Sequence, residues 1–144
     1  MSDQFPELKM KEQIGAPAND HAIQLTAALS GNKVVVTGTG GATLPPKSGS
    51  HRFDFTLDDQ TGLNVSFLSL DAADNSTSCP PPAGQNSQQI KSVNMNGTSA
   101  SFTDSNSGGA MPISYQWNFT CTDRSKLPIS YDPIINNGGS NLDR

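Results

Sequence analysis

The chain has 144 residues, of which 33% are hydrophobic and 15% are charged, and its formal net charge is -4. A chain of this length is expected to form one domain. The charges are scattered and no Lys/Arg cluster is longer than a pair, so we expect neither nucleic acid nor a membrane surface as a partner. No stretch approaches the ~20 consecutive apolar residues that a membrane-spanning helix needs.

The N-terminal segment, residues 1–20, is predicted to be a flexible polar arm. Its apolar stretches are only one or two residues long, and charged residues such as Glu7, Lys9 and Lys11 interrupt them. It therefore lacks the apolar core of a signal peptide. We expect a cytoplasmic protein if the chain is full length, and a secreted or periplasmic one if a leader was removed.

Alternating apolar and polar residues predict four strands in the first half of the chain. The turn signature Ser30-Gly31-Asn32 joins the first two strands into a hairpin. In the fourth strand the alternation changes phase, which indicates a bulge near Phe67-Leu68 or burial on both faces. The predicted strands are 22–29, 33–37, 52–57 and 63–70.

The second half of the chain contains the clearest strand pattern, over residues 113–121. Ile113, Tyr115, Trp117, Phe119 and Cys121 share one parity, so we expect these side chains in the core. Asn96-Gly97 predicts a hairpin between strands at 90–95 and 98–103. A last strand is predicted at 127–131, and Ile134-Ile135 either extends it or docks on the core.

These segments predict an all-β fold of about seven to nine short antiparallel strands. The leading architecture is an immunoglobulin-like or related Greek-key β-sandwich. It would occupy residues 21–136 and be followed by a polar tail, 137–144. The immunoglobulin Cys…Trp…Cys order is absent, because Trp117 lies on the same strand as Cys121.

The two cysteines leave two interpretations open. Cys121 is either a small buried hydrophobic residue or one half of a disulfide with Cys79. Such a bond would close a loop of about 40 residues, for which chain entropy gives roughly 3–4 kcal/mol.

One run of carboxylate and amide side chains, Asp71, Asp74 and Asn75, is a candidate binding site. Oxygen atoms of this kind on a loop can collect calcium, although the spacing matches no EF-hand. No other cofactor is expected, and no metal-ligand spacing is present.

The histidines, His21 and His51, each precede a predicted strand and are expected to be solvated loop residues. The alternative is a hydrolase-type enzyme that uses His51 with Asp54 or another acid. No Gly-x-Ser-x-Gly elbow accompanies it.

The composition and motifs favour a non-enzymatic binding or structural domain. Recognition is expected in the long loops 38–51, 71–89 and 104–112, or along an edge strand, which could also give a homodimer. The partner would be an unknown protein or a glycan. The second hypothesis is a carbohydrate-binding module that is assisted by calcium through Asp71, Asp74 and Asn75.

The C-terminal segment Tyr131-Asp132-Pro133-Ile134-Ile135-Asn136-Asn137-Gly138 resembles the ending of the bacterial DP-EP family. More remotely, its aromatic-Asp-Pro sequence is similar to that of bacterial inclusion-body and AidA-like proteins. The resemblance implies a β-sandwich of bacterial origin and brings no catalytic residues with it.

Overall fold

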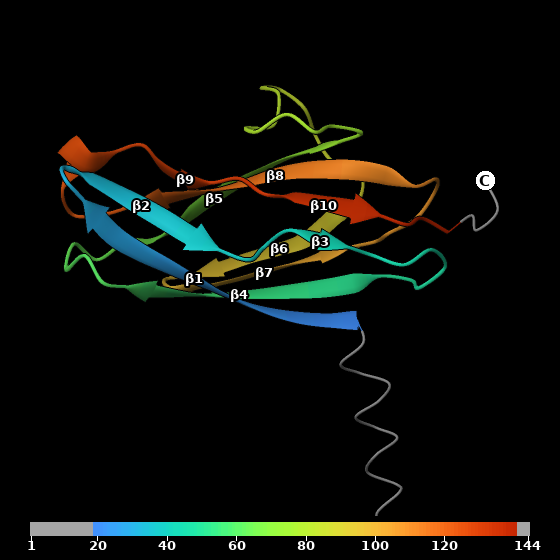
Figure 1. Cartoon of the computed structure of the whole chain (residues 1–144), viewed down its shortest axis with the longest axis horizontal. Coiled ribbons are helices and arrows are strands. Elements are labelled where there is room, and N and C mark those ends of the chain that lie inside the picture. Colours follow the sequence, from blue (N-terminus) through green and yellow to red (C-terminus); the bar gives the residue numbers. More distant parts are fainter. Residues whose placement is uncertain (1–18, 141–144) are drawn as a thin grey trace, which may run out of the picture.

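The computed structural model describes residues 19–140, which form two stacked β-sheets (Figure 1). Within this range there is no α-helix, and the 3-10 turn η2 (Arg124–Lys126) precedes the last two strands. The predicted all-β sandwich is confirmed. Both sheets are mixed, however, because β1 pairs with β4 and β3 pairs with β10 in parallel. The finer immunoglobulin-like or Greek-key assignment is not confirmed by this order.

The first sheet, sheet A, contains five strands. The β1–β2 hairpin turns at Gly31, whose φ of 63° favours glycine. The predicted hairpin around Asn96-Gly97 is also present and joins β6 to β7. In spatial order the strands are β2 (Lys33–Gly38), β1 (Asp20–Ser30), β4 (His51–Asp59), β7 (Ser99–Asp104) and β6 (Ile90–Asn96).

The second sheet, sheet B, is built around the long strand β8. On one side of β8 lies β5, and on the other side β10 and β9 follow one another along its edge. The order is β3 (Ala42–Thr43), β10 (Ile134–Asn137), β8 (Met111–Thr120) and β5 (Ser66–Asp74), with β9 (Ile129–Tyr131) also on β8. Short β3 lies inside the predicted loop 38–51.

The core lies between the sheets and is dominated by aromatic rings. The inward face of β8 carries Tyr115, Trp117 and Phe119, which are at most 2% exposed. Trp117 packs edge-on against Phe55 of sheet A and Phe67 of β5, with ring centroids 5.4 and 4.9 Å apart. The alternation of β8 therefore places its side chains as predicted.

The predicted bulge is also present in β5. The register shifts between Phe67 and Ser69 where β5 pairs with β8, and Leu68 is 57% exposed as a result. The bulge returns Leu70 and Ala72 to the side of the core, where both are partly buried.

The ordered domain extends past the predicted boundary at residue 136. Asn137 is the last residue of β10, and the buried Gly139 donates its N–H to Asn106 Oδ1. Residues 137–140 are therefore packed segments rather than a polar tail. Two predicted segments lie outside the described residues. They are residues 1–18 of the predicted arm and residues 141–144 of the predicted tail.

Candidate functional site

One end of the sandwich interior is polar rather than apolar. On a strand, every second residue faces inward. On each of four strands, the inward-facing position next to the last apolar core residue carries a polar side chain. The four residues are His21 on β1, His51 on β4, Asp104 on β7 and Asn137 on β10. The last three are at most 3% exposed. We call this cluster the polar end.

Two imidazole rings join β1 to β4 at the polar end. His21 Nε2 lies 2.9 Å from His51 Nδ1, and the His21 ring stacks on Phe53 with centroids 4.4 Å apart. The two strands are parallel and pair His21 with Phe53, which brings His21 beside His51. Burial, and then the neighbouring His21, lower the pKa of His51 from its ordinary value of 6.5.

The other nitrogen of His51 reaches the loop before β4. His51 Nε2 lies 2.7 Å from Ser48 Oγ, and Ser48 Oγ donates to the carbonyl of Pro45 at 2.7 Å. Asn106 Nδ2 donates to the same hydroxyl at 3.1 Å. One proton arrangement accounts for all of these contacts: His21 donates to His51 Nδ1, and His51 Nε2–H donates to Ser48.

The Ser48–His51–His21 order is the order of a nucleophile, a base and an orienting group. A hydroxyl, however, has one proton and two lone pairs, and Ser48 uses all three with Pro45, His51 and Asn106. No lone pair is left to attack a substrate. The arrangement therefore acts as a clamp on the loop rather than as an activated nucleophile.

Asp104 occupies the centre of the polar end. Its Oδ1 accepts from the backbone N–H of Asn106 and from Asn137 Nδ2, both at 2.9 Å. Burial raises the pKa of Asp104, and these two hydrogen bonds only partly offset the effect. The nearby Asp74 raises it further. Within residues 19–140, Asp104 Oδ2 has no hydrogen-bond partner.

Asn106 ties three loops together above the polar end: 45–50, 105–110 and 138–140. Its Nδ2 donates to Ser48 Oγ and to the Gly49 carbonyl, both at 3.1 Å, while its Oδ1 accepts from the Gly139 N–H at 2.8 Å. Backbone bonds add to this, since Lys47 N–H donates to the Gly139 carbonyl. Loops that are distant in sequence thus form one platform.

A hollow of about 520 Å³ opens on this platform. Its lining contains one cation, Lys47, and no carboxylate. Three of the lining residues are serines, so hydroxyl groups make up much of its polar surface. The lining residues are Lys47, Gly49, Ser105, Asn106, Ser107 and Ser140.

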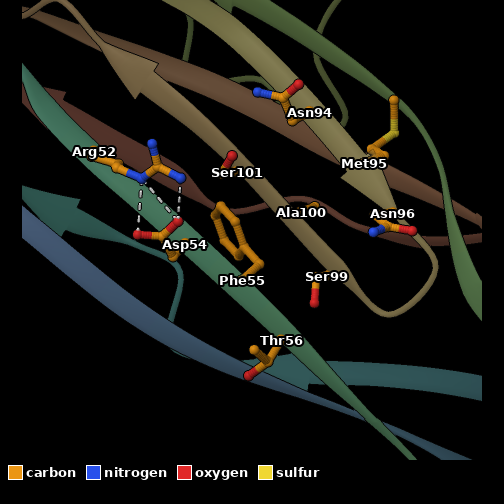
Figure 2. Close-up of a pocket in the computed structure, with 10 residues that line it drawn as sticks. All are labelled: Arg52, Asp54, Phe55, Thr56, Asn94, Met95, Asn96, Ser99, Ala100 and Ser101. Carbon is orange, nitrogen blue, oxygen red and sulfur yellow. Dashed lines mark hydrogen bonds and ion pairs between the residues drawn. The ribbon is translucent and has the colours of Figure 1, made fainter.

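A second hollow, of about 270 Å³, crosses the outer face of sheet A over β4, β7 and β6 (Figure 2). Its two charged lining residues neutralise one another, because Arg52 Nε and Nη2 each lie 2.9 Å from Asp54 Oδ1. Both lie on β4, and all the lining residues belong to β4, β6 or β7. This groove offers less specific chemistry than the platform.

The structure does not bring Asp71, Asp74 and Asn75 together. The strand β5 continues to Asp74, and residues three apart on a strand face opposite sides. Asp71 Oδ2 accepts from Asn118 on the outer face, while Asp74 accepts from Ser87 Oγ and Gln88 N–H. Among the described residues, no three His, Cys, Asp or Glu side chains are grouped to hold a metal ion.

The expectation of solvated loop histidines is wrong for His51, which is 2% exposed. Its predicted pairing with Asp54 is also wrong. The two residues have opposite parity on β4, so His51 points into the sandwich and Asp54 points out toward Arg52. The same parity links His51 to Phe53, and that signal in the sequence would have indicated burial.

Of the two interpretations of the cysteines, the structure has no bond between Cys79 and Cys121, and both thiols are free. Cys79 is exposed in the loop after Asp74, at one end of β5. Cys121 is buried just beyond Thr120, which pairs with Ser66 at the other end of β5. A nine-residue strand spans about 30 Å, so the two loops start far apart.

Comparison with known proteins adds little to this geometry. No protein-family model matches the chain, and no curated protein does. Among solved structures, it is similar to the inclusion body protein PixA of Burkholderia cenocepacia J2315, with 9% identity, a TM-score of 0.27, and coverage of 88% of this chain and 99% of that one. A likeness at that TM-score carries no argument. The resemblance to the DP-EP family stays a prediction. Between residues 19 and 140, no helix is long and apolar enough to cross a membrane.

Proposed function

We propose that the protein is a non-enzymatic binding domain that receives its ligand in the hollow at the polar end. The observation that carries this proposal is the side chain of Asn106, which bonds to two other loops at once. Loops fixed in this way lose little conformational entropy when a ligand binds, so the site is pre-organised. The predicted recognition by long loops fits this arrangement for 38–51 and 104–112.

The lining of the hollow supports an acidic saccharide as the ligand. The hydroxyl protons of Ser105, Ser107 and Ser140 already go to acceptors within the protein, such as Gln89 Oε1 and the Gly108 carbonyl. Their oxygens keep lone pairs that can accept from sugar hydroxyls. The Lys47 ammonium favours a carboxylate or sulfate substituent, and no lining carboxylate opposes it. Calcium is not part of the proposal, because Asp71 and Asp74, two of the three residues predicted to bind it, lie on opposite faces of β5.

The test is a titration of the ¹⁵N-labelled protein with acidic and matched neutral oligosaccharides, followed by amide chemical shifts. We expect shifts at Lys47, Ser105 and Ser107, and tighter binding of the acidic sugars. Lys47→Ala should weaken binding about tenfold, which corresponds to ~1.4 kcal/mol. Lys33→Ala is the matched control, since Lys33 is an exposed lysine in the β1–β2 hairpin at the other end of β1.

Three results would count against the proposal. Shifts confined to Arg52, Ser101 and Asn94 would move the binding site to the groove of Figure 2. Equal effects of Lys47→Ala and Lys33→Ala would indicate non-specific charge attraction. The absence of any shift with the whole sugar panel would exclude a saccharide ligand in this hollow.

A further inference from the structure

Two buried oxygen atoms at the polar end have no hydrogen-bond partner among the described residues, Asp104 Oδ2 and Asn137 Oδ1. They belong to groups that already contact one another, because Asn137 Nδ2 donates to the other oxygen of Asp104 at 2.9 Å. The orientation of the amide is fixed, since Asn137 Nδ2 lies between Asp104 Oδ1 and Gln89 Oε1. Each group therefore has one satisfied and one unsatisfied atom.

The two unsatisfied oxygens cannot hydrogen-bond to each other while Asp104 is ionised. A carboxylate oxygen and an amide oxygen both accept hydrogen bonds, and neither carries a proton to donate. Asp104 is fully buried, and a buried carboxylate without a cationic partner is strongly unfavourable. A proton placed between the two oxygens would remove both problems at once.

We propose that Asp104 is a neutral carboxylic acid in the folded protein, and that its Oδ2–H donates to Asn137 Oδ1 to close an acid–amide pair. The pair is held by two hydrogen bonds, one in each direction. It links β7 of sheet A to β10 of sheet B. It also lies at the base of two platform loops, because Asp104 and Asn137 are the residues from which 105–110 and 138–140 emerge.

The charged and titratable groups around Asp104 favour the acid form. From β5, the negative charge of Asp74 opposes ionisation of Asp104. From β4, His51 is its cross-strand neighbour, but both ring nitrogens of His51 contact other groups, His21 and Ser48. From β1, His21 Nε2 contacts His51. Neither histidine therefore makes an ion pair with Asp104 among the described contacts.

The direct test is the pH titration of carboxyl ¹³C shifts in protein labelled at aspartate, with Asp104 assigned through the Asp104→Asn variant. We expect Asp104 to show the shift of a protonated acid at neutral pH. Asp59 supplies the ionised reference, because hydrogen bonds from Thr61 and Val65 lower its pKa despite the opposing effect of burial. This test does not depend on the proposed binding function.

Two variants of Asp104 provide a second readout. Asp104→Asn keeps a neutral donor that can face Asn137 Oδ1, so we expect a melting temperature within about 3 °C of wild type at neutral pH. Asp104→Ala leaves Asn137 and the Asn106 N–H without their partner, and should lower it by roughly 5–15 °C. Wild type, but not Asp104→Asn, should lose stability as the pH rises through the folded pKa of Asp104.

The proposal is overturned if the carboxyl signal of Asp104 is ionised at pH 7. It is also overturned if Asp104→Asn is as destabilising as Asp104→Ala, because a neutral donor would then not replace the group. A signal that changes on addition of calcium or of a chelator would show that a cation, rather than a proton, lies between the two oxygens. Ionised Asp104 together with protonated His51 would instead indicate an ion pair.

Discussion

His21 Nε2 lies 2.9 Å from His51 Nδ1, a distance at which the two rings share a single proton. His21 is the second residue of β1 and His51 is the first residue of β4. The contact therefore attaches the start of β1 to the strand beside it. Protonation of His51 at Nδ1 would place two N–H groups against each other and break the attachment.

This relationship predicts that stability declines in mildly acidic solution. The folded-state pKa of His51 is lowered by burial and by His21, so the unfolded chain binds the proton more readily. The stabilisation is therefore complete above about pH 6.5 and is lost as the pH falls through the folded pKa. Urea unfolding midpoints measured between pH 8 and pH 5 should fall over the lower part of this range.

The control for this prediction is His51→Asn, which removes the titrating ring. We expect this variant to be less stable than wild type at pH 8, because Ser48 and His21 lose a partner, and to lose little more between pH 7 and pH 5. An equally steep decline in both proteins would assign the acid sensitivity to other groups.

A second prediction concerns Gly40, which two tyrosines hold against sheet B. Tyr115 Oη donates to the Gly40 carbonyl at 2.8 Å, and the Gly40 N–H donates to Tyr131 Oη. A Cβ at this position would lie 2.5 Å from Tyr115 Oη and 2.9 Å from Tyr131 Oη. Gly40→Ala should therefore destabilise the protein by about 1–3 kcal/mol, as judged by chemical unfolding.

Gly109→Ala is the matched control for Gly40→Ala. A Cβ at Gly109 would meet no atom within 4 Å, and its φ is not among the positive values of the chain. Its effect should stay within about 0.5 kcal/mol. If both variants are equally stable, the tyrosine contacts do not restrict the space at Gly40.

A third prediction concerns Asp59, which organises the turn after β4. Its Oδ1 accepts from the Thr61 backbone and hydroxyl at 2.9 and 2.6 Å, and its Oδ2 accepts from the Val65 N–H at 2.9 Å. Asp59→Asn would place an amide donor against one of these donors. We expect a loss of about 1–3 kcal/mol at neutral pH, measured by chemical unfolding.

The effect of Asp59→Asn should shrink in acid. Although burial alone would raise the pKa of Asp59, the hydrogen bonds from Thr61 and Val65 lower it below its ordinary value of 3.8. Its stabilisation is thus present above that value and is lost as the pH falls through the folded pKa. Asp58→Asn serves as the control, since Asp58 is exposed. Among the described residues, its carboxylate accepts a side-chain hydrogen bond from Gln60 only. A similar loss in Asp58→Asn would contradict the role given to Asp59.

The local sequence pattern predicted the strand faces and hairpins, because residues close together in sequence determine them. The alternation around Trp117 fixed which face of β8 is buried, because a slip by one residue would expose the aromatic side chains. Asn96-Gly97 predicted its hairpin because both residues tolerate a tight reversal. The parallel pairing of β1 with β4 was not predictable in this way, since it joins segments about 30 residues apart.

The candidate site was missed for the same reason. The inward parity of His51 could be read from Phe53, but its contact with His21 depends on the parallel register of β1 and β4. Asn106 lies in a loop without periodicity, and its importance arises only where three loops meet. Asp71, Asp74 and Asn75 form a convincing oxygen-rich run in sequence, yet the strand extends through the first two and separates them.

The last prediction concerns the two thiols, which differ sharply in accessibility. Cys79 is exposed, while Cys121 is 9% exposed and its sulfur contacts the Asp123 carbonyl at 3.2 Å. In native protein we expect one thiol to react rapidly with a disulfide reagent and the other only after unfolding. Slight desolvation of the thiol and the nearby Asp132 raise the pKa of Cys79, so its rate should still be increasing above pH 8.5. Cys79→Ser should abolish the rapid phase and leave the slow one. Unfolded protein that yields no free thiol in the absence of reductant would show instead that Cys79 and Cys121 are oxidised.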